Sequence, residues 1–211
     1  NGAGKSTLAN IISGAIPRTS GRLLCNGKEI DAQSIQQAQD MGIQTVYQDL
    51  ALAPDLNVPC NIFLGREIIK QSFFGKLFNI LDMKQMEKIS REHLAELGIG
   101  LKSMTVPVKS LSGGERQALA VAKAVAWCES VLIMDEPTAA LGARQQALVY
   151  STMRAAADKD LGVIVISHDI PKMLEVSDRI YIMRQGEVIA NLVSRETNLQ
   201  TVLSLMLTGK A

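Results

Sequence analysis

The chain has 211 residues, of which 47% are hydrophobic and 20% are charged. The length predicts one or two domains. The composition predicts a substantial core and excludes a disordered chain. The formal net charge is +1, with lysine and arginine spread along the sequence, which argues against a nucleic-acid surface as the main partner. No run in the sequence approaches the roughly 18 apolar residues that a membrane-spanning helix needs.

Strand and helix patterns alternate along the chain, which predicts an α/β architecture with a largely parallel sheet. A helix is expected over residues 7–13. Asn26-Gly27 supplies the turn of a hairpin in GRLLCNGKEI, because both residues tolerate the positive φ angles of a tight turn. The segment GIQTVYQ is expected to be a strand.

The character of the sequence changes from Asp49 to about Val108. This segment holds a proline-containing loop, a short helix near residues 61–64 and the phenylalanine-rich stretch QSFFGKLFNIL. A helix then begins after Asp82, a plausible N-cap, with methionine and leucine at helical spacing. The segment is predicted to be a helical insertion into the α/β core.

The alternation resumes after the insertion. Helices are expected over residues 112–127 and 145–157, a hairpin turns at Gln185-Gly186, and the last residues form a helix. The apolar runs VLIMDE and GVIVISHD are predicted to be strands buried on both faces of a parallel sheet.

The first seven residues, NGAGKST, match the end of the phosphate-loop pattern G-x-x-x-x-G-K-[ST]. Small residues let the backbone approach a phosphate, and the free amides of a helix start bind anions. Lys5 is expected to reach the β- and γ-phosphates, and the Ser6 hydroxyl to hold Mg²⁺. The expected phosphate-binding residues are Asn1, Gly2, Ala3, Gly4, Lys5, Ser6 and Thr7.

Two carboxylates, Asp135 and Glu136, end the apolar run VLIMDE. Ligands of open α/β sheets bind at the carboxyl edge of the strands. Asp135 is expected to hold Mg²⁺, and Glu136 to polarise an attacking water as a general base. The alternative is that these acids only cap a strand.

The segment LSGGERQ places Ser112, Gly113 and Gly114 before a predicted helix. The glycines suggest a second anion-binding helix start. The alternative is an ordinary capping box, in which Ser112 and Glu115 each bond the other's backbone. The two interpretations are compatible, because a capped helix can still direct its amides outward.

The motifs NGAGKST, VYQD, LSGGERQ, VLIMDEPT and ISHD occur in this order and at suitable spacing. Together they resemble the nucleotide-binding domain of an ABC transporter, over essentially the whole chain. The resemblance implies a P-loop NTPase (RecA-like) core with a mostly parallel sheet. It implies a single domain over residues 1–211, with the core in 1–48 and 127–211 and a helical subdomain carrying LSGG in 49–126.

The resemblance also implies roles and ligands. Two such domains face head to tail and enclose ATP and Mg²⁺, so that Ser112, Gly113 and Gly114 of one protomer approach the γ-phosphate held by Lys5 of the other. Gln48 matches the glutamine that contacts Mg²⁺ and senses the membrane subunit, and so takes part in catalysis. His168 matches the switch histidine that contacts the γ-phosphate.

Two features depart from the family pattern. Gly142, in Ala139-Ala140-Leu141-Gly142, stands where the family usually has an aspartate. The second departure is at the start, because the first glycine of the phosphate-loop pattern would lie two positions before Asn1. We therefore expect the natural protein to begin upstream, with the N-terminal β-subdomain and its adenine-stacking aromatic largely missing from this sequence.

The segments NIFLGRE and PTAALGARQ resemble the single-domain ATPases of ribose-, xylose- and fructose-type sugar importers. This resemblance implies a homodimer or a paired ABC ATPase, bound to membrane permease subunits at the cytoplasmic face of the membrane. A sugar-binding protein would be an indirect partner, and no nucleic acid is expected. The alternatives are a soluble ABC ATPase of translation or DNA repair, and a truncated remnant with poor hydrolysis.

Overall fold

The computed structural model describes residues 2–46, 50–139 and 141–209 of the 211-residue chain. The helices of these residues are α1 (Lys5–Ile12), α2 (Ile35–Asp40), α3 (Val58–Ile62), α4 (Phe73–Leu77), α5 (Met83–Glu96), α6 (Gly113–Ala126), α7 (Ala143–Ala157), α8 (Ile170–Val176) and α9 (Leu199–Thr208). Two short 3-10 helices lie at Val108–Ser110 and Ser194–Glu196. The strands are β1 (Leu23–Cys25), β2 (Lys28–Ile30), β3 (Ile43–Val46), β4 (Val131–Asp135), β5 (Gly162–Ile166), β6 (Arg179–Arg184) and β7 (Glu187–Val193).

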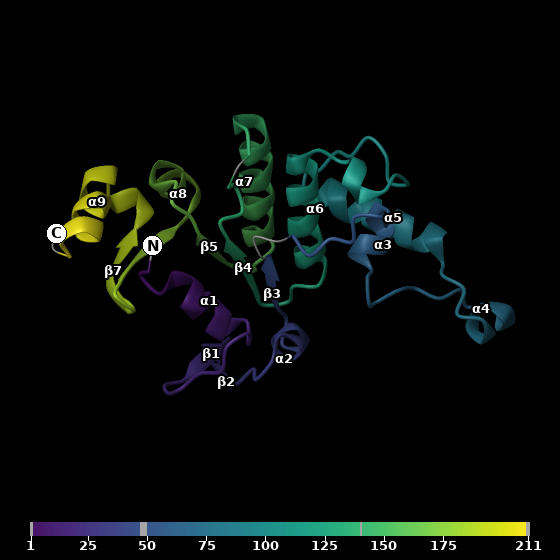
Figure 1. The fold of residues 1–211 in the computed structure, drawn as a ribbon, viewed down its shortest axis with the longest axis horizontal. Coiled ribbons are helices and arrows are strands. Elements are labelled where there is room, and N and C mark those ends of the chain that lie inside the picture. Colours follow the sequence, from purple (N-terminus) through teal and green to yellow (C-terminus); the bar gives the residue numbers. More distant parts are fainter. Residues whose placement is uncertain (1, 47–49, 140, 210–211) are drawn as a thin grey trace.

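A three-stranded parallel sheet lies at the centre of the molecule, in the order β3-β4-β5 (Figure 1). In its register Val46 pairs with Met134, and Asp135 pairs with Ile166. The carboxyl ends of all three strands therefore meet at one edge of the sheet. This arrangement confirms the predicted α/β class with a parallel core.

The two apolar runs of the sequence differ in burial. Leu132, Ile133 and Met134 of β4 are fully buried, as predicted for a central strand. The same prediction is wrong for β5, where Ile164 keeps 39% of its surface exposed. The reason is position: β5 pairs with β4 alone among the described strands, so its side chains have fewer neighbours.

Two antiparallel hairpins accompany the central sheet. Asn26 and Gly27 join β1 to β2 with φ angles of 50° and 75°, and Gln185 and Gly186 join β6 to β7 with 52° and 86°. Both predicted hairpins are confirmed by these antiparallel pairings. Positive φ at both central residues gives a turn whose twist matches that of the flanking strands.

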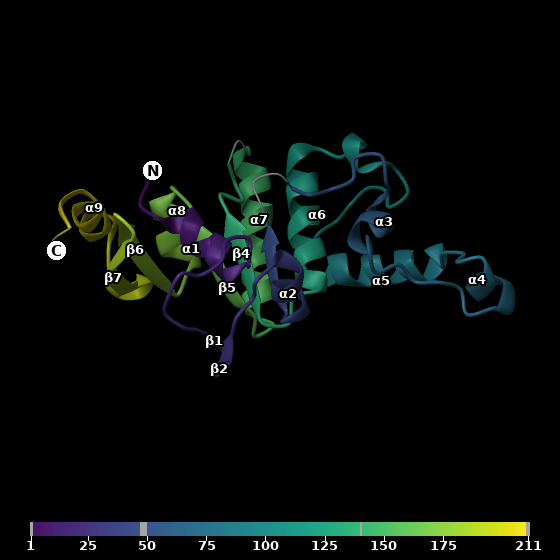
Figure 2. The ribbon, with the colours of Figure 1, turned by 60° about the horizontal axis from the view of Figure 1, so that its bottom comes forward.

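The middle of the chain is helical, as predicted, and extends to one side of the sheet (Figure 2). Asp82 caps α5 by accepting a hydrogen bond from the Gln85 amide at 3.1 Å. Met86 and Leu94 of α5 share one apolar core with α6, β4 and α7. No helix in the described part of the chain has the length and apolar run that crossing a bilayer requires.

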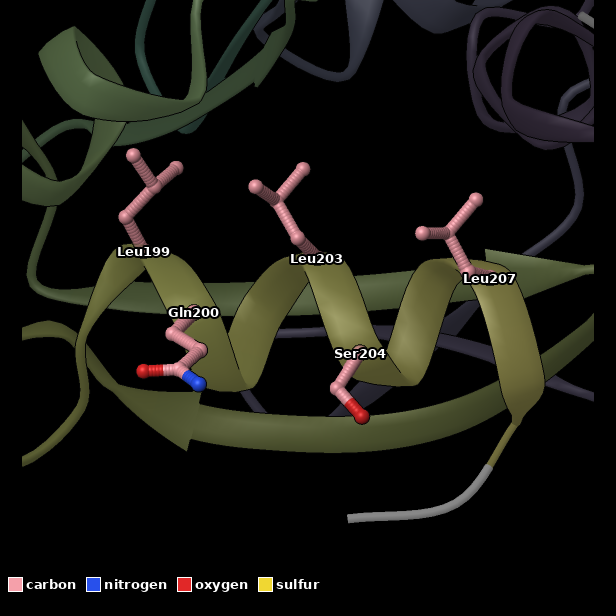
Figure 3. Close-up of a pocket in the computed structure, with 5 residues that line it drawn as sticks. All are labelled: Leu199, Gln200, Leu203, Ser204 and Leu207. Carbon is pink, nitrogen blue, oxygen red and sulfur yellow. The ribbon is translucent and has the colours of Figure 1, made fainter.

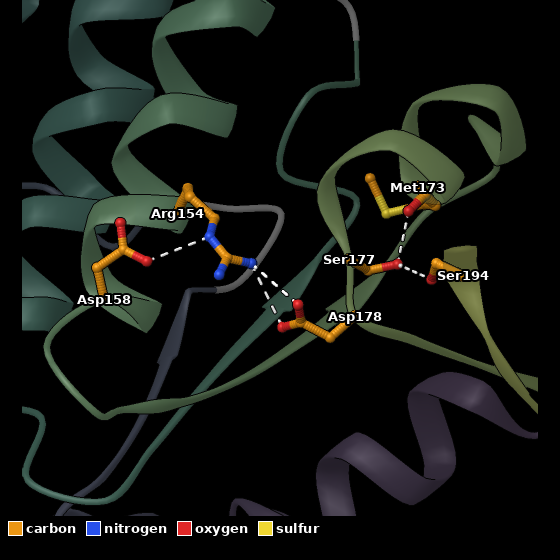
Figure 4. A network of polar contacts seen from close by, with 6 residues as sticks. All are labelled: Arg154, Asp158, Met173, Ser177, Asp178 and Ser194. Atoms are coloured by element: carbon orange, nitrogen blue, oxygen red, sulfur yellow. Dashed lines mark hydrogen bonds and ion pairs between the residues drawn. The ribbon is translucent and has the colours of Figure 1, made fainter. Parts of the chain in front are cut away.

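A polar network joins the end of α7 to the segments around β6 (Figure 4). Arg154 of α7 pairs with Asp158 at 3.2 Å and with Asp178 at 3.3 Å, and these carboxylates raise the pKa of its guanidinium. The Ser177 hydroxyl lies 3.2 Å from that of Ser194. These contacts hold the β6–β7 unit against the central part of the molecule.

One buried amide holds the loop over residues 53–57. Asn61 is fully buried in α3 and accepts a hydrogen bond from the Ala53 amide at 2.7 Å. Its Nδ2 group lies within 3.2 Å of the carbonyl oxygens of Ala53, Leu56 and Asn57. This one side chain therefore pairs with several backbone groups of a loop that belongs to no sheet.

We expect Asn61→Ala to lower the free energy of unfolding by about 2–4 kcal/mol, because several buried backbone groups lose their partner. Urea unfolding followed by circular dichroism measures this change. Gln85→Ala, on the exposed face of α5, is the control and is expected to stay within about 0.5 kcal/mol of the parent. An equal, small effect for both variants would contradict the assigned role of Asn61.

Candidate functional site

The phosphate loop ends in a helix start with open amides. Gly2 and Gly4 have φ angles of 80° and 91°, in the left-handed region that favours glycine. Gly4 is the N-cap of α1, and no side chain caps this helix. The first amides of α1 are therefore free of side-chain acceptors and available to an anion.

The loop also rests on a distant part of the chain. The Gly186 amide, in the turn between β6 and β7, donates to the Ala3 carbonyl at 3.1 Å. A Cβ at Gly4 would lie 3.2 Å from the Gly186 Cα, so a side chain at position 4 would force the turn away. The motif's second glycine is thus required both by its φ angle and by this close approach.

The predicted carboxylates lie at the carboxyl edge of the sheet. Asp135 is the last residue of β4, and the Glu136 amide donates to the Ile166 carbonyl of β5 at 2.9 Å. Glu136 has a φ angle of 50°, an uncommon conformation for a residue with a side chain. Backbone strain of this kind clusters at functional sites.

Glu136 and His168 meet although 32 positions separate their numbers in the sequence. The His168 Nε2 atom lies 3.0 Å from Glu136 Oε1, at ion-pair distance but without the alignment of a hydrogen bond. Oε1 is itself shielded from solvent and has no hydrogen-bond partner among the described residues. The acceptor capacity of this oxygen is therefore not used by any described residue.

The helix start at Ser112 is capped as the sequence predicted. The Glu115 amide donates to Ser112 Oγ at 3.3 Å, and the Ser112 amide donates to the Glu115 carboxylate at 2.8 Å. The latter bond lowers the pKa of Glu115. Ser112 and Gly113 are nevertheless exposed, so the capped helix start still faces outward.

Gly114 has a packing role that its motif does not reveal. It is buried, and a Cβ at this position would lie 2.5 Å from the Gln145 Cβ of α7. The Gln145 Oε1 atom in turn accepts a hydrogen bond from the Gly142 amide at 2.8 Å. Gln145 therefore bridges the start of α6 and the start of α7.

The described residues bring some of the predicted site together and leave other parts separate. No hydrogen bond or ion pair within the described ranges joins Lys5 or Ser6 to Asp135 or Glu136. Both ribbon views place α1 and α6 on opposite sides of the central sheet and α7 (Figures 1 and 2). Asn1 and Gln48 lie outside the described residues.

An apolar surface lies apart from these motifs. Figure 3 shows Leu199, Leu203 and Leu207 projecting from the same side of α9, with Gln200 and Ser204 beside them. All five residues belong to one helix, and the surface that they form is open and shallow. None of the predicted site residues lines it.

Comparison with protein families matches residues 1–139 to the ABC transporter family. The fructose import ATP-binding protein FrcA of Rhizobium meliloti is 41% identical over 211 residues, which cover 100% of this chain and 81% of that protein. The xylose/arabinose import ATP-binding protein XylG of Sulfolobus acidocaldarius is 42% identical over 206 residues, covering 98% and 79%. The chain belongs to the ABC transporter family, as an ATP-binding domain and hence an ATPase.

Solved structures of ATP-binding cassettes have the same fold as this chain. A dimeric ATP-binding cassette, MJ0796, solved in a post-hydrolysis state with ADP and Pi, aligns with a TM-score of 0.71 at 23% identity. The alignment covers 92% of this chain and 82% of that chain. The predicted P-loop NTPase core is therefore confirmed.

We expect Gly114→Ala to lower the free energy of unfolding by about 1–3 kcal/mol, because the added methyl group collides with Gln145. Gly113→Ala is the matched control, since its nearest neighbour would be 4.0 Å away, and it is expected to change stability by less than about 0.5 kcal/mol. Urea unfolding measures both.

A Gln145→Gly background separates this collision from other effects of the methyl group. In that background Gly114→Ala is expected to lower the free energy of unfolding by less than it does in the parent. The reason is that the Gln145 side-chain atoms, which the added methyl group would meet, are absent. An unchanged cost in that background would contradict the assigned contact.

Proposed function

We propose that this chain is the ATP-hydrolysing subunit that energises import of a monosaccharide through a membrane permease. Binding of MgATP would close a head-to-tail dimer, and hydrolysis would open it. The observation that carries the proposal is the placement of two helix starts, at Gly4 and at Ser112, on opposite sides of α7.

This placement explains why one chain has two anion-binding helix starts. Because the two helix starts lie on opposite sides of α7, a γ-phosphate held at Lys5 would face away from Ser112 of the same protomer. A second protomer, turned head to tail, can present its own Ser112 to that phosphate. The dimeric ADP- and Pi-bound relative of this fold supports such an arrangement.

ATP binding is assigned to the phosphate loop. The open amides of α1 would bind the β-phosphate, and Lys5 would place its charge against the β- and γ-phosphates. Lys5 has no hydrogen bond or ion pair to another described residue, so its ammonium group is available. The positions from Gly2 to Thr7 would complete this cradle, together with Asn1.

Mg²⁺ is assigned to Asp135 and Ser6, with Gln48 as a further ligand. Within the described ranges, no group of three or more His, Cys, Asp or Glu side chains could hold a metal ion by itself. This fits Mg²⁺, which uses one or two carboxylates and completes its shell with water and substrate phosphates. When bound, the ion would neutralise charge on the phosphate oxygens.

Glu136 is assigned as the general base. Its carboxylate, in which Oε1 has no hydrogen-bond partner among the described residues, would accept a proton from the water that attacks the γ-phosphorus. His168, 3.0 Å from that oxygen, would hold the carboxylate and contact the γ-phosphate. Positioning and electrostatic stabilisation around the γ-phosphate would supply most of the remaining rate enhancement.

We propose that the helical segment contacts the permease. We propose that residues 49–126 form the helical subdomain and that residues 1–48 and 127–211 form the core. Between them lies a groove lined by residues of β3, α3 and α6, where the Arg66 guanidinium lies 4.7 Å from the centre of the Trp127 ring. Contact with the permease would place the chain at the cytoplasmic face of the membrane.

The choice of a sugar importer rests on the relatives. FrcA and XylG are named for fructose and for xylose/arabinose import, and this chain aligns with about four-fifths of each. These names do not favour a soluble ATPase of translation or DNA repair, nor a remnant with poor hydrolysis. A sugar-binding protein would then be the indirect partner that delivers the monosaccharide.

We expect Glu136→Gln to slow ATP hydrolysis about 10²- to 10⁴-fold, because the amide cannot take the proton from water. Nucleotide binding should persist, since Lys5 and the loop amides are untouched. Phosphate release and fluorescent-nucleotide titration measure the two properties. Glu92→Gln, exposed on α5, is the control, and hydrolysis within a few-fold of the parent in Glu136→Gln would refute the assignment.

We expect Ser112→Arg to abolish turnover, because the bulky cation blocks the approach of the helix start to the partner's γ-phosphate. Ser112→Ala is the control for the lost cap and should retain most of the activity. Lys5→Ala should be inactive as well.

Mixing the Ser112→Arg and Lys5→Ala proteins tests the head-to-tail dimer. The mixed dimer has one intact site, built from Lys5 of one protomer and Ser112 of the other, so part of the hydrolysis should return. If the mixture stays as inactive as its components, the shared site is disproved.

A further inference from the structure

A cluster of large apolar side chains stands exposed at one end of the molecule. We call residues 70–81, which include α4, the Phe tip. Phe73, Phe74, Leu77 and Phe78 keep 76%, 66%, 60% and 67% of their surface exposed. Three of the four phenylalanines of the chain are in this tip. Both ribbon views place α4 at the end of the molecule opposite α9 (Figures 1 and 2).

The Phe tip has a defined conformation. Its stem is closed by the Lys70 amide, which donates to the Ile80 carbonyl at 2.9 Å, and by the Asp82 amide, which donates to the Ile68 carbonyl at 2.7 Å. Gly75 is buried at its centre, where a Cβ would lie 2.7 Å from the Lys70 Cβ. The fold therefore fixes the backbone from which the exposed side chains project.

The phenyl rings contact mainly one another. Phe73 and Phe74 meet edge to face with ring centres 5.6 Å apart, and Phe74 stacks on Phe78 at 6.5 Å. Scattered exposed apolar residues are normal, but a contiguous exposed group of this kind marks an interaction site.

The charges of the tip indicate which partner it fits. Its charged residues are Lys70 and Lys76, and no carboxylate lies between Glu67 and Asp82. Both lysines are exposed, and no ion pair to another described residue engages either of them. The cores of protein interfaces are depleted in lysine, whereas segments that lie in a bilayer interface combine phenylalanine and leucine with lysine.

We propose that the Phe tip inserts into the headgroup region of a bilayer that contains anionic lipids. The phenyl and leucyl side chains would enter the boundary between headgroups and acyl chains, and the two ammonium groups would bind lipid phosphates. With one helical turn and two cations the contact is weak and reversible, and it would add to attachment through a permease. It depends neither on the catalytic assignments nor on the sugar.

Vesicle sedimentation of the purified protein, without nucleotide, tests the proposal. The protein should bind vesicles of phosphatidylcholine and phosphatidylglycerol more strongly than vesicles of phosphatidylcholine alone, and added salt should weaken the binding. The triple variant Phe73→Ser/Phe74→Ser/Phe78→Ser should lower vesicle affinity at least about ten-fold, since affinity follows buried apolar area. Lys70→Gln/Lys76→Gln should remove the preference for anionic vesicles, a loss of roughly ten- to thirty-fold.

Matched variants control for exposed apolar area and for charge. Leu203→Ser/Leu207→Ser removes exposed leucines at the opposite end of the molecule, and Lys84→Gln/Lys88→Gln removes exposed lysines of α5. Both should bind vesicles like the parent, and circular dichroism should show that every variant is folded.

Other outcomes would overturn the proposal. Absence of vesicle binding would do so, and so would equal binding by the parent and the Phe variant. If the Phe variant instead loses concentration-dependent self-association in sedimentation velocity while no vesicle is bound, the tip meets a second copy of the chain. If the Phe variant loses only its co-purification with a permease and binds vesicles like the parent, the tip binds a protein and not a bilayer.

Discussion

The parallel register of β3, β4 and β5 is the constraint on which the rest of the molecule depends. Because Val46 lies beside Met134 and Asp135 beside Ile166, three chain segments end at the same edge of the sheet. The Glu136 amide continues this alignment by bonding the Ile166 carbonyl, and His168 follows two residues later. A shift of one residue in either pairing would send the carboxylate and the imidazole to opposite faces.

Packing between α6 and α7 connects this edge to the second helix start. Gln145 lies against Gly114 and accepts a hydrogen bond from Gly142, while the buried Thr138 hydroxyl lies 3.0 Å from that of Tyr150. The segment after Glu136 is thus held by α7, and α7 is held against the start of α6. This packing connects the backbone that follows Glu136 with the exposed start of α6 through the side chains of α7.

The sequence predicted what local chemistry determines. Asn26-Gly27, the Asp82 cap and the Ser112–Glu115 capping box could be identified because each depends on neighbouring residues alone. The exposure of Ile164 could not, since it depends on how many strands cover β5, and no pattern marks the positive φ of Glu136. The short helices α2 and α8 have too few turns to show a helical period, and the prediction omitted both.

The hydrogen bond between Ala3 and Gly186 has a consequence for biosynthesis. The phosphate loop stands at the beginning of this sequence, but the turn that supports it is made near the end. A ribosome must therefore release most of the chain before the loop acquires its final shape, and closing so long a loop carries an entropic cost. Until then the glycine-rich segment lacks this support, so its final shape depends on the folding of the β6–β7 turn.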